Sequence, residues 1–281
     1  MLKPFTPLRL KVVAVVASAL VLQSCEDDPA PAAPTEAPAE PLAPASLQVV
    51  TPEPALNRET LLAAVAKAAS DHAAGAPRTG ADPLVRRNFD ISLPFGCLGA
   101  EALPIGDIGD GLPRWSWSAD RQSIRLSLIP ADWTEADLIT GSAGPIPWEA
   151  VEGLWVSRPW TTADGCPPAP INPPTIGPMA AAPETVGLAA VFEEGGSRLG
   201  RRNGRAYAFT VRPEGDASAV APREGYRVRL QGKITAFPDG RAIRCSAADP
   251  RQRPVCVAAV QLDRLAFQTA TGQTLSEWRP G

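Results

Sequence analysis

The chain has 281 residues, of which 44% are hydrophobic, and its formal net charge is −3. This length accommodates one large domain or two small ones. The sequence has a single histidine and no P-loop, G-x-G-x-x-G, G-x-S-x-G or H-E-x-x-H motif, which are patterns typical of nucleotide-binding, hydrolase and zinc-protease sites. We therefore expect a protein that is not an enzyme and that needs no metal ion or cofactor.

The N-terminal segment predicts an export signal. Basic residues at Lys3, Arg9 and Lys11 precede an uncharged run over residues 12–22. This run has the length of a signal-peptide core and is too short to span a bilayer comfortably. No other segment approaches the ~18 consecutive apolar residues of a membrane-spanning helix. Residues 1–24 are therefore interpreted as a signal peptide and excluded from the fold.

The end of this segment, Leu22-Gln23-Ser24-Cys25, resembles the lipobox of bacterial lipoproteins. The resemblance covers residues 1–25 and includes the basic flank, the apolar core and Leu-x-Ser-Cys in that order. It implies cleavage before Cys25, a diacylglycerol thioether on its sulfur and an acylated (palmitate) amine. The alternative is a secreted protein with a chance cysteine. In this family an aspartate after the cysteine retains some members in the inner membrane. The residue here is Glu26, which favours the outer membrane, with the protein facing the periplasm.

A linker and a helix follow. Residues 25–56 are rich in Pro, Ala and Glu and contain no Lys or Arg, a composition that cannot bury enough apolar surface to offset chain ordering. We predict that this linker is disordered. Residues 57–76 predict one helix, because apolar residues recur on one face at helical spacing and capping residues flank them. The face comprises Leu61, Leu62, Val65 and Ala69; Asn57 or Thr60 is the expected N-cap, and Gly75 ends the helix.

The remainder predicts a mainly β fold, of sandwich or barrel type, because short β-type runs alternate with Gly and Pro turns. The runs cover residues 89–95, 114–118, 123–129, 153–157, 186–193, 205–212, 226–237, 241–247 and 255–269. Turns over residues 202–205 and 238–240 suit hairpins.

Charge suggests a further division of the β region. Residues 57–186 have nine basic and fifteen acidic residues, whereas residues 187–281 have fifteen basic and nine acidic ones. Two β subdomains are expected on this basis: an acidic one rich in Trp (86–166) and a basic one (186–281), joined by a Pro-rich connection (167–185). A single module is the alternative.

Four cysteines follow Cys25, and an even number behind an export signal predicts disulfides in an oxidising compartment. Of the three possible pairings, Cys97–Cys166 and Cys245–Cys256 keep each bridge within one half of the chain, and the second staples a hairpin. A zinc site is disfavoured because the sequence has no C-x-x-C spacing and one histidine.

Two clusters are candidate binding residues. Aromatic rings beside an arginine can stack on a sugar ring or clamp a peptide, and the candidate groove comprises Trp115, Trp117, Trp155, Arg158 and Trp160. A core role for these tryptophans is the favoured alternative. A basic run can contact lipid phosphates or an acidic protein; it comprises Arg198, Arg201, Arg202 and Arg205. A solvated hairpin tip is the favoured alternative there.

These features predict a lipid-anchored envelope protein with a non-catalytic binding or scaffolding role. Its expected partners are the membrane through Cys25 and one of the cell wall, an anionic lipid or an envelope protein. Nucleic acid is excluded because the export signal places the basic residues outside the cytoplasm. The alternative is a binder or hydrolase of peptidoglycan or another glycan that uses the Trp-rich half. A subunit of a larger envelope complex is a third possibility.

Overall fold

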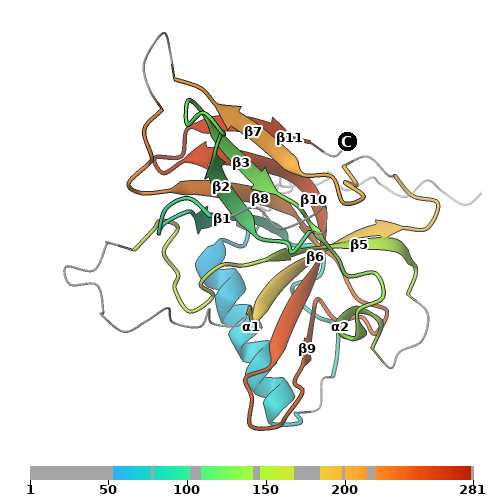
Figure 1. The fold of residues 1–281 in the computed structure, drawn as a ribbon. Coiled ribbons are helices and arrows are strands. Elements are labelled where there is room, and N and C mark those ends of the chain that lie inside the picture. Colours follow the sequence, from blue (N-terminus) through green and yellow to red (C-terminus); the bar gives the residue numbers. More distant parts are fainter. Residues whose placement is uncertain are drawn as a thin grey trace, which may run out of the picture. The chain divides into compact units, whose positions relative to one another are not determined.

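A mainly β architecture with one long helix is confirmed in the computed structural model (Figure 1). The structure describes residues 53–76, 79–101, 109–141, 146–167, 184–197, 200–213 and 219–279. The predicted signal peptide, Cys25, nearly all of the linker, most of the Pro-rich connection and Arg198 lie outside these residues. Thr51–Gly281 forms one compact unit.

The helices are α1 (Arg58–Ala73) and the short α2 (Asp137–Thr140). The strands are β1 (Asn88–Phe95), β2 (Pro113–Trp117), β3 (Ile124–Leu128), β4 (Ala131–Asp132), β5 (Trp148–Trp155), β6 (Val186–Glu193), β7 (Tyr207–Val211), β8 (Tyr226–Ile234), β9 (Ile243–Ser246), β10 (Val255–Thr269) and β11 (Thr274–Trp278).

The long strand β10 organises the larger, eight-stranded sheet, whose main path is β1-β8-β10-β6-β5-β4. Strands β8 and β9 pair with the same edge of β10. Ala259 shows this, because its carbonyl accepts a hydrogen bond from the Thr235 N–H just after β8 and its N–H donates one to the Ala242 carbonyl just before β9. The other edge pairs first with β6, in parallel, and then with β11. A β-bulge between Leu262 and Arg264 interrupts the β8 pairing.

A second, three-stranded sheet, β2-β3-β7, covers one part of the larger sheet. Figure 1 shows these strands at the upper end of the view, with α1 and β9 at the lower end. Aromatic contacts join the two layers. The ring centroids of Trp115 in β2 and Tyr226 in β8 are 6.4 Å apart, and those of Tyr207 in β7 and Trp278 in β11 are 5.3 Å apart. This half of the fold is therefore a sandwich of two sheets.

The other half of the larger sheet is buried on both faces. In β10, Ala258 and Val260 join the main core together with α1, whereas Val257 and Ala259 join a second cluster with Ile139 of α2. Side chains alternate between faces along a strand, so a strand covered on both faces must be apolar at every position. This explains why residues 186–192 and 255–260 are almost entirely apolar and show no alternation of polar residues.

Helix α1 has the predicted cap and apolar face. The Asn57 side chain accepts a hydrogen bond from the Thr60 backbone N–H at 2.9 Å, which satisfies one of the free donors of the first turn. The four predicted apolar residues are all buried. Arg58 is also buried, at 2% exposure, a position that helical periodicity did not predict.

Both predicted disulfides are present. The bridge Cys97–Cys166, here called the long-range disulfide, joins the segment after β1 to the segment after β5 and spans 69 residues. The bridge Cys245–Cys256, here called the hairpin disulfide, joins residues that face each other across β9 and β10. Disulfides persist in oxidising environments, so they indicate an extracytoplasmic compartment.

The charge boundary near the Pro-rich connection does not separate two sheets. β5 pairs with β6 and β1 with β8 in the larger sheet, and β3 pairs with β7 in the smaller one, so each sheet contains strands from both sides of that boundary. Among the described residues, the two expected hairpins do not form. Turns form at 202–205 and 238–240, but β6 and β7 belong to different sheets, and β8 and β9 both pair with β10.

Candidate functional site

A pocket of about 280 Å³ lies where β10 separates from β6. The parallel pairing ends at Val260 and Ala190, and the pairing of the same edge with β11 begins only at Leu265. Between these points, Gln261–Asp263 line one wall of the pocket and the end of β6 lines another. We call this cavity the strand-gap pocket.

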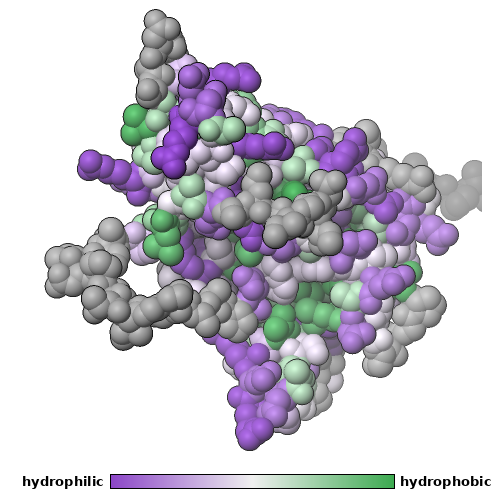
Figure 2. Space-filling model, in the orientation of Figure 1, coloured by the Kyte–Doolittle hydropathy of each residue, from purple (hydrophilic) through white to green (hydrophobic). Residues whose placement is uncertain are grey.

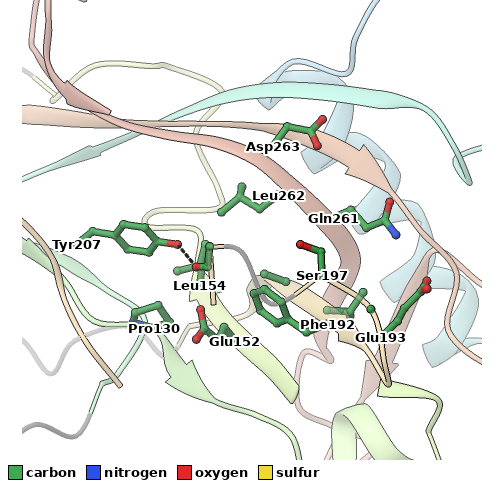
Figure 3. Close-up of a pocket in the computed structure, with 14 residues that line it drawn as sticks. Pro130, Glu152, Leu154, Phe192, Glu193, Ser197, Tyr207, Gln261, Leu262 and Asp263 are labelled. Carbon is green, nitrogen blue, oxygen red and sulfur yellow. Dashed lines mark hydrogen bonds between the residues drawn. The ribbon is translucent and has the colours of Figure 1, made fainter. Parts of the chain in front are cut away.

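The wall of the strand-gap pocket combines apolar, hydrogen-bonding and acidic side chains, as Figure 3 shows. Its apolar part includes Pro130, Leu154, Phe192 and Leu262, and its polar part Glu152, Glu193, Ser197, Tyr207, Gln261 and Asp263. In the close-up, Tyr207 and Glu152 lie on one side and Glu193 and Gln261 on the other. Mixed lining of this kind orients small ligands.

Glu152 is the buried carboxylate of the pocket, at 7% exposure. Its Oε1 accepts backbone N–H groups from Arg202 and Asn203 at 2.6 and 2.9 Å. Burial raises the pKa of this carboxyl, and the two N–H groups and the nearby arginines oppose the rise. Glu152 therefore anchors the loop that precedes β7.

Tyr207 holds the same loop through a second contact. Its hydroxyl donates to the Gly200 carbonyl at 3.2 Å, drawn dashed in Figure 3, and the Arg202 guanidinium lies over its ring at 4.6 Å. Burial raises the pKa of the Tyr207 hydroxyl far above its usual value, and the Glu152 carboxylate adds to this shift. The hydroxyl is therefore a neutral donor at physiological pH.

The basic run is used within the fold. Arg201 forms an ion pair with Glu149 at 2.9 Å, Arg202 stacks on Tyr207, and Arg205 donates to the Arg202 carbonyl. Of these contacts, the one between Arg202 and Tyr207 adjoins the strand-gap pocket, which Tyr207 lines. Arg205 is the most exposed of the three, and it remains at the surface of the turn.

The predicted groove of tryptophans is not assembled as one surface. Trp115 is a core residue, at 1% exposure, and its indole packs edge-on against half-buried Trp117 at 5.6 Å. Trp155 packs instead against Trp133 at 4.7 Å. Gly153 and Gly187 leave room for the Trp133 ring, because a Cβ on either would lie within 2.6 Å of it. Trp115 cannot stack on a ligand, since protein covers it.

Arg158 and Trp160 lie in the turn after β5. The Arg158 guanidinium donates to the Pro94 carbonyl at 3.4 Å and lines a smaller pocket of about 180 Å³ beside Cys97 and Leu98. Trp160 is 60% exposed. Of the five residues of the candidate groove, Trp160 is exposed, Trp117, Trp155 and Arg158 are half-buried, and Trp115 is buried.

Sequence reasoning missed the strand-gap pocket. Glu152, Glu193 and Asp263 come from three strands, and no local pattern links them. In the described ranges, no group of three or more His, Cys, Asp or Glu side chains is placed to hold a metal ion.

Figure 2 shows that hydrophilic side chains cover much of the face viewed, with smaller hydrophobic areas between them.

The part of the chain that the structure describes contains no helix with the length and apolar character required to cross a membrane. Comparison with protein-family models, curated proteins and solved structures gave no significant match.

Proposed function

We propose that this chain is a lipid-anchored protein of the bacterial cell envelope, facing the periplasm, with a non-catalytic binding role. The pairing of the cysteines carries the proposal. The two disulfides use four of the five cysteines, which leaves Cys25, directly after the lipobox-like Leu-x-Ser, for lipid attachment. One acyl chain binds a membrane only marginally, so a diacylglycerol thioether with an acylated amine suits stable anchoring. The strand-gap pocket is the binding site we assign to the folded part.

Membrane fractionation of cells that express Cys25→Ser tests the anchor. We expect this variant to lose palmitate labelling and to leave the membrane fraction. The paired variant Cys97→Ser/Cys166→Ser is the control, because it removes cysteines without touching the lipobox, and it should keep the label. Labelled, membrane-bound Cys25→Ser would contradict the proposal.

The position of Glu26 favours the outer membrane in the same proposal. A Glu26→Asp variant should shift the protein toward the inner-membrane fraction of a density gradient, because aspartate after the lipidated cysteine is the retention signal that the resemblance implies. An unchanged distribution would remove the argument for outer-membrane sorting while leaving the anchor intact.

A second candidate function is binding of a cell-wall glycan, and the exposure of Trp160 beside Arg158 favours it. An exposed indole can stack on a sugar ring. In a pull-down on purified peptidoglycan, Trp160→Ala should lose retention. Leu98→Ala, which removes an exposed apolar side chain without an aromatic ring, should retain it. If the unmodified chain is not retained, this candidate fails.

A further inference from the structure

Arg227 of β8 is a half-buried cation without a partner. Its Nε atom is buried and has no hydrogen-bond acceptor. Within the described residues, its guanidinium forms neither an ion pair nor a hydrogen bond. Arg229, two positions further along the same face of β8, differs because it pairs with Asp90 of β1. Burying a polar group without a partner costs free energy, so Arg227 is an uncompensated charge.

The Arg227 side chain lies against the segment that follows β5. A Cβ on Gly165 would lie 3.5 Å from the Arg227 Nη2 atom, and Pro94 of β1 is the residue opposite Arg227 in the sheet. The Pro94 carbonyl also accepts the hydrogen bond from Arg158, at 3.4 Å. The two arginines therefore flank the same proline.

The surroundings of Arg158 are positively charged. Burial lowers the pKa of Arg58, the Arg158 charge adds to this effect, and the exposed Asp164 carboxylate opposes it. Burial also lowers the pKa of Arg158, and no acid among the described residues opposes that shift. Arg158 has a φ of +49°, a strained conformation for a residue other than glycine, and such strain is concentrated at functional sites.

The other nearby segments do not neutralise these charges. Glu101 lines the smaller pocket together with Arg158, but its carboxylate pairs with Arg114 at 3.7 Å. Residues 167–183, which continue the segment after β5, contain no Asp or Glu. A counter-charge for Arg227 and Arg158 is therefore supplied by neither.

We propose that Arg227, together with Arg158 beside Pro94, binds an oxyanion: a phosphate or carboxylate group carried by a ligand at the surface. Guanidinium groups hold such anions through charge-assisted hydrogen bonds. The oxyanion site is separate from the strand-gap pocket. It rests on the binding role proposed above and is independent of the lipid anchor.

Equilibrium dialysis with radiolabelled orthophosphate and radiolabelled acetate tests the ligand class. The protein is the full chain carrying Cys25→Ser, and sodium chloride keeps the ionic strength constant, because screening weakens any exposed charge contact. At least one of the two oxyanions should bind. A preference for phosphate identifies a phosphorylated ligand and a preference for acetate a carboxylated one, and either result supports the site. If neither binds, the proposal fails.

Arg227→Met should weaken binding of the preferred oxyanion about tenfold or more, because it removes a charged hydrogen-bond donor. Without the oxyanion, its midpoint in urea denaturation should not fall, since the substitution removes an uncompensated charge. Arg158→Gln should also weaken binding, and unchanged affinity would exclude Arg158 from the site.

Arg229→Met is the matched control on the same face of β8. It should keep the affinity of the parent chain and lower the denaturation midpoint, because Asp90 loses its partner. A purely structural role for Arg227 would give Arg227→Met a lower midpoint with unchanged binding, and that result would overturn the proposal. Membrane fractionation of Cys25→Ser tests the anchor separately, so either proposal can fail alone.

Discussion

Removal of the Arg58 side chain should be among the most destabilising single changes in the chain. Its guanidinium donates to four backbone carbonyls: Thr161 at 3.1 Å, Ser92 at 3.3 Å, Ser157 at 2.7 Å and Arg158 at 3.0 Å. Arg58 thereby ties the first turn of α1 to β1 and to the turn after β5. In Arg58→Ala all four carbonyls lose this donor at once.

The expected cost follows from the number of bonds. At about 1 kcal/mol net for each hydrogen bond, the four bonds contribute about 4 kcal/mol to the free energy of unfolding. Arg58→Lys keeps the charge but not the planar fork of donors, so it should recover about half of that loss. Urea denaturation followed by tryptophan fluorescence would measure both values.

Arg251→Ala is the matched control. The Arg251 side chain is 90% exposed and, among the described residues, pairs only with nearby Asp249, so its removal should leave the free energy of unfolding almost unchanged. If Arg58→Ala costs no more than this control, the four hydrogen bonds do not hold α1 in place and the reasoning is wrong.

Three further changes test the packing, the electrostatics and the bridges. In Gly153→Ala the new Cβ would lie 2.1 Å from the Trp133 indole, so the unfolding free energy should fall by about 1–3 kcal/mol; an unchanged denaturation midpoint would exclude this close contact. Hydrogen bonds from Arg229 lower the pKa of the Asp90 carboxyl. The resulting stability is present above the unfolded pKa of about 3.9 and is lost as the pH falls through the folded pKa, so Asp90→Asn should flatten the acid limb of a stability–pH curve, and an equally steep limb would refute the assignment. Replacing both cysteines of the long-range disulfide, which closes 69 residues, should cost about 4 kcal/mol, against about 3 for the hairpin disulfide, which closes 11; the reverse order in urea denaturation would contradict the loop-closure argument.

The local structure could be predicted from the sequence because its signals are local. Each expected β-run overlaps an observed strand, and α1 begins at Arg58, directly after the predicted cap Asn57. The strands β4 and β11 and the short helix α2 were not predicted. β4 and α2 are too short to show a period of apolar spacing. β11 is as long as β2, but its apolar residues Leu275 and Trp278 are three positions apart and so do not alternate with polar ones.

The pairing of strands was less predictable, because it depends on contacts between distant residues. Gly204 and Gly240 adopt the positive φ that tight turns require, but a turn does not specify that its flanking strands pair with each other. The same limit applies to the site. Glu152, Glu193 and Asp263 line one pocket only because of the order of strands in the sheet. The sequence also could not separate core tryptophans such as Trp115 from exposed ones such as Trp160.

The position of β10 in the sheet constrains when the protein can fold. In the described part of the chain, removing β10 would leave β1–β8 and β4–β5–β6 as separate pieces and would deprive β9 and β11 of their partner. β10 begins at Val255, after every other strand except β11. For a chain that crosses a membrane unfolded, the sheet can close only once that late segment has emerged. The hairpin disulfide, which includes Cys256, must also form at this final stage.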